Sequence, residues 1–457
     1  MTNSHQILIA FITFLSSSLL AILYVLAYHQ KWFLNLISKV WPASLKSRVI
    51  NLFINNESIY FENTSKPPYV LFEDRKRTVV FWVFFGFLTL LALTLRYLSL
   101  PAINEDLKYQ VFKWFDYIAA NGGFSALEDT SISNYNPPYL FLLACATYFP
   151  WISKLVLIKI ISIIFDFLCA IAIYKIVRHF ASFLIAWLAY FFVLLSPIVW
   201  LNSAYWGQCD AIYTSFILFS IYSFIKKKPI FGYVLFAISF SFKLQAVFFL
   251  PFLLVILFGV DHRWYLFFVI PITFLIMSLP AVIAGQSIVN ILTIYLDQTG
   301  QYAFLTLNAP SIFGLFNYLE SQPSYEIIGF SLLLIIMCGI SLVSFWNRGR
   351  IGDKQLILFA LISLLVTPFL LPRMHERYFY PAAVSYIILL FSLPNLWVAA
   401  LLINFTTFFS YFPFLWDLEV LPLPVLSIMN FISIVILLVS ISRLNKNVVG
   451  VKKAEFP

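Results

Sequence analysis

The chain has 457 residues, of which 62% are apolar and 11% are charged. Soluble globular proteins carry about 25% charged residues, so this composition excludes a chain that lies mostly in water. The formal net charge is +9, but the basic residues stand at the ends of apolar segments and do not gather on one element. We therefore expect membrane lipids around the chain and no nucleic-acid partner.

Apolar segments of membrane-spanning length recur from one end of the chain to the other. A helix needs about 20 apolar residues to cross the hydrocarbon core, and these segments are continuous, without the alternation of a barrel strand. We therefore predict an all-α polytopic membrane protein with about 11–13 transmembrane helices. The clearest segments are 7–28, 78–98, 155–176, 264–284, 326–346 and 425–441.

Residues 1–77 form a separate N-terminal part in this interpretation. The apolar segment 7–28 has no small-residue cleavage signal, so we predict a membrane anchor with its N-terminus outside. The connector after it is basic and aromatic-rich and contains the Pro67-Pro68 break, which favours a segment lying against the cytoplasmic membrane face. The sequons at Asn56 and Asn63 fall in this connector, so they are no evidence for the endoplasmic reticulum. Residues 78–457 form the main transmembrane domain.

Two polar loops interrupt the apolar segments of this main domain, at about 99–137 and about 285–325. Between them, the apolar stretch 137–151 is short for a membrane span, so it either lies in the interface or forms a half-length helix. The stretch 229–258 contains Lys243 and is either one long span or two short ones.

Clusters of basic residues alternate with the polar loops along the chain. By the positive-inside rule, such clusters mark the cytoplasmic ends of helices. The loops at 99–137 and 285–325 then lie on the exoplasmic face. The clusters are Arg75-Lys76-Arg77, Lys226-Lys227-Lys228, Arg348 with Arg350 and Lys354, and Lys452-Lys453.

Three basic residues break this pattern. Arg373 and Arg377 lie on the predicted outer side, and Lys243 lies within an apolar stretch. A cation in hydrocarbon is costly unless an anion or water receives it, so we expect these residues to face a cavity and to be functional. For all three residues the alternative is snorkelling to the interface or pairing with a nearby acid. His375 and Glu376 precede Arg377, and the three together suit the binding of an oxyanion or a sugar hydroxyl.

Acidic residues on the predicted outer side supply the complementary chemistry. Glu105 and Asp106 follow a membrane helix closely, where partial desolvation increases the basicity of a carboxylate, as a general base requires. The alternative is a solvated pair of loop acids. Lys159 and Asp166 are seven positions apart and project from one helical face, which favours a structural polar contact between helices. Asp106 with Asp210 could hold a divalent cation, but no dense carboxylate cluster requires a metal, and no other cofactor is indicated.

Several motifs follow one another in an order that is familiar from one enzyme group. They are Asp106 to Trp114, Gly122-Gly-Phe, Asn134-Tyr-Asn-Pro-Pro-Tyr139, Trp206-Gly-Gln-Cys-Asp210, Phe242-Lys-Leu-Gln-Ala246, Asn308-Ala-Pro310 and Arg373-Met-His-Glu-Arg-Tyr-Phe379. Over about 100–385 the chain resembles bacterial GT-C membrane glycosyltransferases related to the GPI mannosyltransferase II group. The last motif is also similar to the His-Glu-Lys motif of the eukaryotic glucosyltransferases that extend the dolichol-linked oligosaccharide.

The chain departs from this pattern beside the presumed catalytic acid. Leu107 follows Asp106 where a tyrosine is expected, and Glu105 directly precedes it, so either acid could be the base. Residues 1–77 lie outside the resemblance.

The resemblance implies a GT-C-like bundle that acts as an inverting hexosyltransferase. Mannose or glucose would move from a polyprenyl-phosphate-linked donor to a lipid-linked glycan or other acceptor at the exoplasmic face. The implied base is Asp106 or Glu105, and the implied ligands of the donor phosphate are Arg373, His375, Arg377 and Lys243. Substrate-binding residues are expected at Tyr135, Asn136, Trp206, Gln208, Asp210, Asn308 and Glu376. The bacterial cytoplasmic membrane is the favoured location, with the endoplasmic reticulum membrane expected for a eukaryotic source.

A transporter or flippase of a lipid-linked or anionic substrate is the main alternative. Such a protein would place its key groups near the bilayer midplane, in broken helices related by internal symmetry. Here the polar motifs cluster at one predicted face, and the sequence has no convincing internal repeat. A non-catalytic membrane scaffold is a weaker alternative, because it has no use for outer acids and outer arginines.

Overall fold

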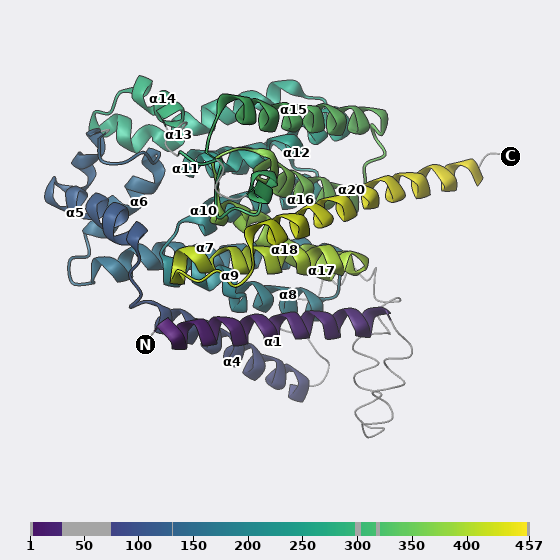
Figure 1. The fold of residues 1–457 in the computed structure, drawn as a ribbon, viewed down its shortest axis with the longest axis horizontal. Coiled ribbons are helices and arrows are strands. Elements are labelled where there is room, and N and C mark those ends of the chain that lie inside the picture. The colour runs from purple at the N-terminus through teal and green to yellow at the C-terminus, as the bar shows by residue number, and fades with distance from the viewer. Residues whose placement is uncertain (1–2, 30–74, 130, 298–302, 317–319, 455–457) are drawn as a thin grey trace.

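The computed structural model describes residues 3–29, 75–129, 131–297, 303–316 and 320–454. Most of the predicted connector, with Asn56, Asn63 and Pro67-Pro68, lies outside the described residues. The described elements are helices apart from two short strands, β1 (Thr306–Leu307) and β2 (Met374–His375). The long helices run side by side along the longest axis of the molecule (Figure 1). This arrangement confirms an all-α polytopic architecture.

Within the described ranges, eight helices are long and apolar enough to cross a membrane. These spans belong to α1 (Asn3–His29), α4 (Arg75–Ser99), α7 (Lys154–Phe180), α13 (Val269–Ala284), α15 (Pro323–Trp346), α16 (Asp353–Leu370), α18 (Trp397–Ser410) with α19 (Phe412–Trp416), and α20 (Leu423–Ala454). A ninth span is possible if α8 (Phe183–Leu195) and the segment Pro197–Trp206, which begins with α9 (Pro197–Trp200), are taken together across a 42° bend.

The remaining helices are short, and some of them explain why the predicted figure of about 11–13 spans exceeds this number. Four apolar helical segments have only 10–17 residues and are not counted among the eight spans. They are α6 (Pro137–Thr147), α10 (Asp210–Ile225), α11 (Pro229–Phe242) and the segment Leu244–Val260, which contains α12 (Leu250–Val255). The stretch 229–258 is therefore two short helices, because extended backbone at Lys243 (φ −154°, ψ 134°) ends α11. The other short helices are α5 (Phe112–Ala120), α14 (Ile288–Asp297) and α17 (Tyr380–Ser392).

The core lies around α16, α17 and α10. In the membrane-spanning part of α16, 89% of the residues are buried inside the protein, whereas the share is 17% for α4 and for α15. The exposed faces of α4 and α15 are apolar, with Val80, Val83, Leu334 and Ile335 among the exposed side chains. Helices that present apolar faces outward suit a lipid environment, whereas a helix buried all round belongs to the protein interior. A buried interior of this kind can hold polar residues away from lipid.

The N-terminal helix α1 packs on this bundle. Phe14 of α1 stacks on Phe408 of α18, with ring centroids 4.2 Å apart. The division of the chain at residue 77 remains a prediction.

The residues that the charge pattern assigns to opposite membrane faces make contacts at opposite ends of the bundle. At one end, His179 contacts both Asp353 (2.7 Å) and Lys226 (3.1 Å), next to the predicted cytoplasmic clusters. At the other end, β1 from the second polar loop pairs in parallel with β2, so that Thr306 aligns with Met374. The first polar loop reaches the same end, because the Asn104 amide donates to the Trp206 carbonyl. The predicted outer loops are thus gathered together.

Candidate active site

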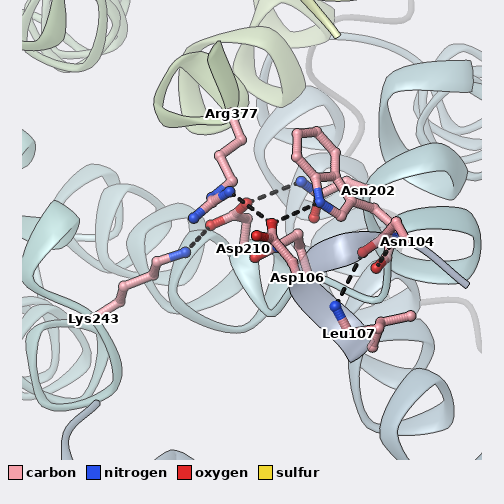
Figure 2. Close-up of polar contacts among 9 residues, drawn as sticks. Asn104, Asp106, Leu107, Asn202, Asp210, Lys243 and Arg377 are labelled. Atoms are coloured by element: carbon pink, nitrogen blue, oxygen red, sulfur yellow. Dashed lines mark hydrogen bonds and ion pairs between the residues drawn. The ribbon is translucent and has the colours of Figure 1, made fainter. Parts of the chain in front are cut away.

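Asp106 stands at the start of a helical segment that its neighbour Asn104 fixes. The Asn104 Oδ1 accepts a hydrogen bond from the Leu107 amide (3.1 Å), and its Nδ2 donates to the Trp206 carbonyl (2.7 Å). An asparagine side chain that satisfies an amide at the start of a helix is a capping interaction. Here the same side chain also holds the first polar loop against the Trp206 segment (Figure 2).

The Trp206 segment is shaped by a π-helical turn and a glycine. The turn Leu201–Trp206 ends at Gly207, whose φ of 77° is left-handed. A Cβ atom at Gly207 would lie 2.7 Å from Cδ2 of Leu107, so only glycine lets the two segments approach so closely. The Trp206 Nε1 and Gln208 Nε2 atoms, on either side of this glycine, both donate to Asp106 Oδ2, at 2.9 Å and 2.7 Å.

Arg377 completes the surroundings of Asp106. Its Nη1 lies 3.0 Å from Asp106 Oδ2, and its guanidinium stands 5.6 Å from the centre of the Trp206 ring. All three donors reach Oδ2, and within the described part of the chain Oδ1 makes no hydrogen bond. The Asp106 side chain keeps 15% of its surface exposed. One carboxylate oxygen is therefore held by three donors, while the other is left without a donor among the described residues.

A second buried ion pair lies next to the first. Lys243 Nζ is 2.5 Å from Asp210 Oδ1, and Asn202 Nδ2 donates to Asp210 Oδ2 at 2.9 Å (Figure 2). The Lys243 ammonium also lies 5.7 Å from the ring centres of Tyr135 and Tyr213. Pairing with an acid is thus the geometry that Lys243 adopts. Asp106 and Asp210 each face a cationic side chain, and among the described residues no group of three or more His, Cys, Asp or Glu could hold a metal ion.

The alternative base Glu105 has different surroundings from Asp106. Its side chain is exposed, and no hydrogen bond joins it to other described residues. The network of Trp206, Gln208 and Arg377 therefore gathers on Asp106 and leaves Glu105 out.

Arg373, His375 and Glu376 lie beside Arg377 but make different contacts. Arg373 pairs with Glu326 of α15 at 2.6 Å. Loss of solvation, with the charges of Arg377 and Lys243, holds the pKa of His375 well below its usual value, so this ring is neutral at physiological pH. Glu376 is 1% exposed, and burial raises its pKa to about 8. It is therefore mostly an uncharged acid at pH 7.

A cavity of about 530 Å³ lies beside these residues, and three of the four predicted phosphate ligands line it. They are Lys243, Arg373 and Arg377. Asp106 does not line the cavity, but it contacts Arg377, which does. The wall also contains the carboxamides Gln110, Asn134, Asn136 and Gln245, the aromatic residues Trp114, Tyr135, Phe242, Phe248, Phe330 and Tyr378, and Leu244, Val247, Glu326, Leu371, Pro372 and Met374.

Asn308, another predicted substrate residue, does not line the large cavity. It bridges to His375 through the backbone, with a left-handed φ of 55°. Asn308 instead lines a separate pocket of about 160 Å³, together with Asp417 and Glu419. The structure therefore does not bring Asn308 into the wall of the large cavity.

Lys159 and Asp166 make structural contacts near the site. Lys159 Nζ lies within hydrogen-bonding distance of the carbonyls of Ser99, Leu100, Ala102 and Tyr205, at 2.7–3.3 Å. Asp166 pairs with Arg96 at 2.8 Å. Lys159 thus joins the segment before Asp106 to the segment before Trp206.

The sequence reasoning missed Asn104 and Asn202, and it placed Gln245 in a motif without giving it a role. An asparagine followed by two acids is a recognisable helix-start pattern, so Asn104 had a local signal. Asn202 had none, because its position depends on a π-helical turn that periodicity does not reveal.

Comparison with known proteins adds an independent observation. Residues 128–259 match the family model for the N-terminal domain of alpha-(1->6)-mannopyranosyltransferases. The matched part is less than a third of the chain. It contains Asn136, Trp206, Gln208, Asp210 and Lys243, whereas Asp106 and Arg377 lie outside it. No curated protein matches the chain. The family match supports a glycosyltransferase activity in general and a sugar donor with a glycan acceptor.

Proposed function

We propose that this protein transfers a hexose, with mannose preferred, from a polyprenyl-phosphate-linked donor to a lipid-linked glycan or other acceptor. The observation that carries the proposal is the arrangement of Asp106, with one fixed and one unbonded carboxylate oxygen, against Arg377 at the wall of a cationic cavity. The mannosyltransferase match at 128–259 supports the choice of sugar. The more specific relationship to the GPI mannosyltransferase II group remains part of this proposal.

The reaction follows from the charges in and beside the cavity. The acceptor hydroxyl attacks the anomeric carbon, the bond from that carbon to the phosphate oxygen breaks, and polyprenyl phosphate leaves. Asp106 takes the hydroxyl proton as general base. Negative charge grows on the leaving phosphate, where Arg377 and Arg373 stabilise it, with Lys243 nearby. A single displacement of this kind inverts the configuration at the sugar carbon.

His375 and Glu376 have roles in this proposal that differ from simple charge pairing. A neutral His375 ring binds phosphate through an N–H donor, without adding a cation. Glu376, as an uncharged acid, can donate a hydrogen bond to a substrate oxygen. Both roles are consistent with the directions in which the pKa values of the two residues are shifted.

The exoplasmic placement of the site rests on the charge pattern. The site gathers the loops that the positive-inside rule assigns to the outer face, at the end of the bundle opposite Lys226 and His179. A donor with an isoprenoid tail must be reached from the lipid phase, and Phe330, a residue of α15 that is 55% exposed, lines the cavity. The bacterial cytoplasmic membrane is our proposed location.

The test is reconstitution of the purified full-length chain in liposomes. Synthetic polyprenyl-phosphate mannose and polyprenyl-phosphate glucose are offered separately with an alkyl mannoside acceptor, and the products are analysed by mass spectrometry. A new glycosidic bond and released polyprenyl phosphate support the proposal. Counterflow of the donor across the bilayer without a glycosidic product would replace it with the transporter alternative.

A further inference from the structure

Two carboxamide side chains in the cavity wall are buried with an oxygen that has no hydrogen-bond donor. Asn136 is 0% exposed and Gln245 is 9% exposed. Among the described residues, neither Oδ1 of Asn136 nor Oε1 of Gln245 has a partner. A buried polar atom that lacks a hydrogen bond destabilises the folded protein. Native proteins rarely leave such atoms unpaired, so these oxygens point to a ligand that satisfies them.

The backbone fixes the position of both carboxamides. Asn136 precedes Pro137 and Pro138, which start α6, and its backbone is extended (φ −65°, ψ 151°). The Tyr295 hydroxyl donates to the Phe240 carbonyl, and its oxygen can accept from the Asn136 amide nitrogen, so Oδ1 is the atom of Asn136 that needs a partner. Gln245 lies in the short helix Leu244–Phe249, which begins directly after the extended residue Lys243. Two segments far apart in sequence thus present amide groups to one cavity.

The unpaired atoms specify the chemistry of their ligand. The oxygens of Asn136 and Gln245 can only accept hydrogen bonds, so their ligand must offer donors. An ionised phosphate offers acceptors alone, so it cannot satisfy the two oxygens. An ammonium group could donate, but Lys243, Arg373 and Arg377 line the same cavity and would repel it. Neutral hydroxyl groups, which both donate and accept, fit this wall.

Aromatic rings stand in the same wall as the carboxamides. The Trp114 and Tyr135 rings are 5.0 Å apart and tilted by 51°. Binding sites for small molecules commonly combine aromatic surface with a few placed polar groups, in cavities of about 300–1,000 Å³. Flat aromatic surface suits the C–H face of a pyranose ring. Lys243 lies 5.7 Å from the Tyr135 ring centre, which connects this wall to the cationic residues.

We propose that Asn136 and Gln245, with Trp114 and Tyr135, form the subsite that binds the hydroxyl groups of the donor hexose. The arginines then bind the phosphate, and the carboxamides recognise the sugar that the phosphate carries. This inference rests on the proposed function, since it assigns the sugar-bearing part of the same donor. Gln245 and Trp114 become residues that determine specificity.

The experiment compares binding of two lipids to the reconstituted full-length chain. Polyprenyl-phosphate mannose carries the sugar, and polyprenyl phosphate does not. We expect Gln245→Leu to weaken binding of the mannose lipid about tenfold, the equivalent of one hydrogen bond, while binding of polyprenyl phosphate is unchanged. The matched control is Gln286→Leu, because Gln286 is 7% exposed and lies outside the cavity wall. This control should leave both affinities unchanged.

The outcomes separate this inference from the proposed function. If the wild-type chain transfers hexose and Gln245→Leu binds both lipids as the wild type does, the subsite assignment is wrong and the transfer activity stands. If the wild-type chain forms no glycosidic bond with either hexose donor, the proposed function fails and takes the subsite with it. Should Gln245→Leu not fold, as judged by thermal unfolding, Trp114→Leu gives the same comparison. An equal loss of both affinities in Trp114→Leu would also overturn the assignment.

Discussion

Arg377 and Asp106 are 271 positions apart in sequence, and their side chains meet at 3.0 Å. The contact joins the segment after α16 to the segment after α4, so it closes the site across the fold. The guanidinium contacts the carboxylate and also lines the cavity. An anion that binds Arg377 therefore changes the electrostatic surroundings of Asp106. Under the proposed function, this arrangement couples the donor phosphate to the general base through one residue.

The first prediction concerns the base. Asp106→Asn removes the proton acceptor but keeps a side chain of the same size, so turnover should fall at least about a hundredfold while donor affinity is nearly kept. Glu105→Gln should retain most of the activity, because Glu105 is exposed and outside the network. Initial rates with polyprenyl-phosphate mannose check both. An unchanged rate in Asp106→Asn would remove this residue from the mechanism.

The second prediction concerns the phosphate. Arg377→Ala should chiefly weaken donor binding, by about tenfold to a hundredfold, because a charge-assisted contact in a desolvated site is lost. Arg263 offers a control, since it forms an exposed pair with Asp261 within its own loop. Arg263→Ala should leave donor affinity unchanged in the same binding assay. Equal affinity of Arg377→Ala and the wild type would assign Arg377 a structural role.

The sequence predicted the members of this site better than their pairings. Asp106 and Arg377 were singled out by residue type and by the side of the membrane on which they fall, and Trp206 and Gln208 by the family resemblance. All four meet in the structure. The choice between Asp106 and Glu105 was beyond the sequence. Neighbouring positions on a helical segment point about 100° apart, so the direction of the segment decides which acid faces inward.

The course of the backbone near the site was also beyond the sequence. Hydropathy left the stretch 229–258 as either one long span or two short ones around Lys243, and only the backbone of the folded protein decides for two. The π-helical turn that ends at Gly207 depends on tertiary contacts, including the close approach of Leu107. Such local departures from regular helix are set by packing and not by composition.

The third prediction concerns the Lys243 and Asp210 pair. Removing one member leaves a buried charge without its partner, which costs about 3–5 kcal/mol, whereas removing both costs much less. Lys243→Met should therefore lower the thermal unfolding temperature in detergent markedly, and Lys243→Met with Asp210→Asn should recover much of that loss. Unfolding scans of the wild type, the two single variants and the double variant at equal detergent concentration test this. Additive effects of the two substitutions would mean that the pair contributes little coupling.

The last prediction is a pH dependence that arises at Glu376. Its pKa is raised from 4.5 to about 8 by burial, so the folded protein holds a proton that the unfolded chain releases. The unfolded state binds fewer protons between these values, and stability therefore falls as pH rises, by about 1.4 kcal/mol per pH unit for one group. The contribution is complete below about pH 4.5 and is lost as pH passes 8. Glu376→Gln, which is neutral at every pH, should match the wild type near pH 5 and exceed its unfolding temperature near pH 8. A constant difference between the two proteins across this range would show that Glu376 ionises normally in the folded state.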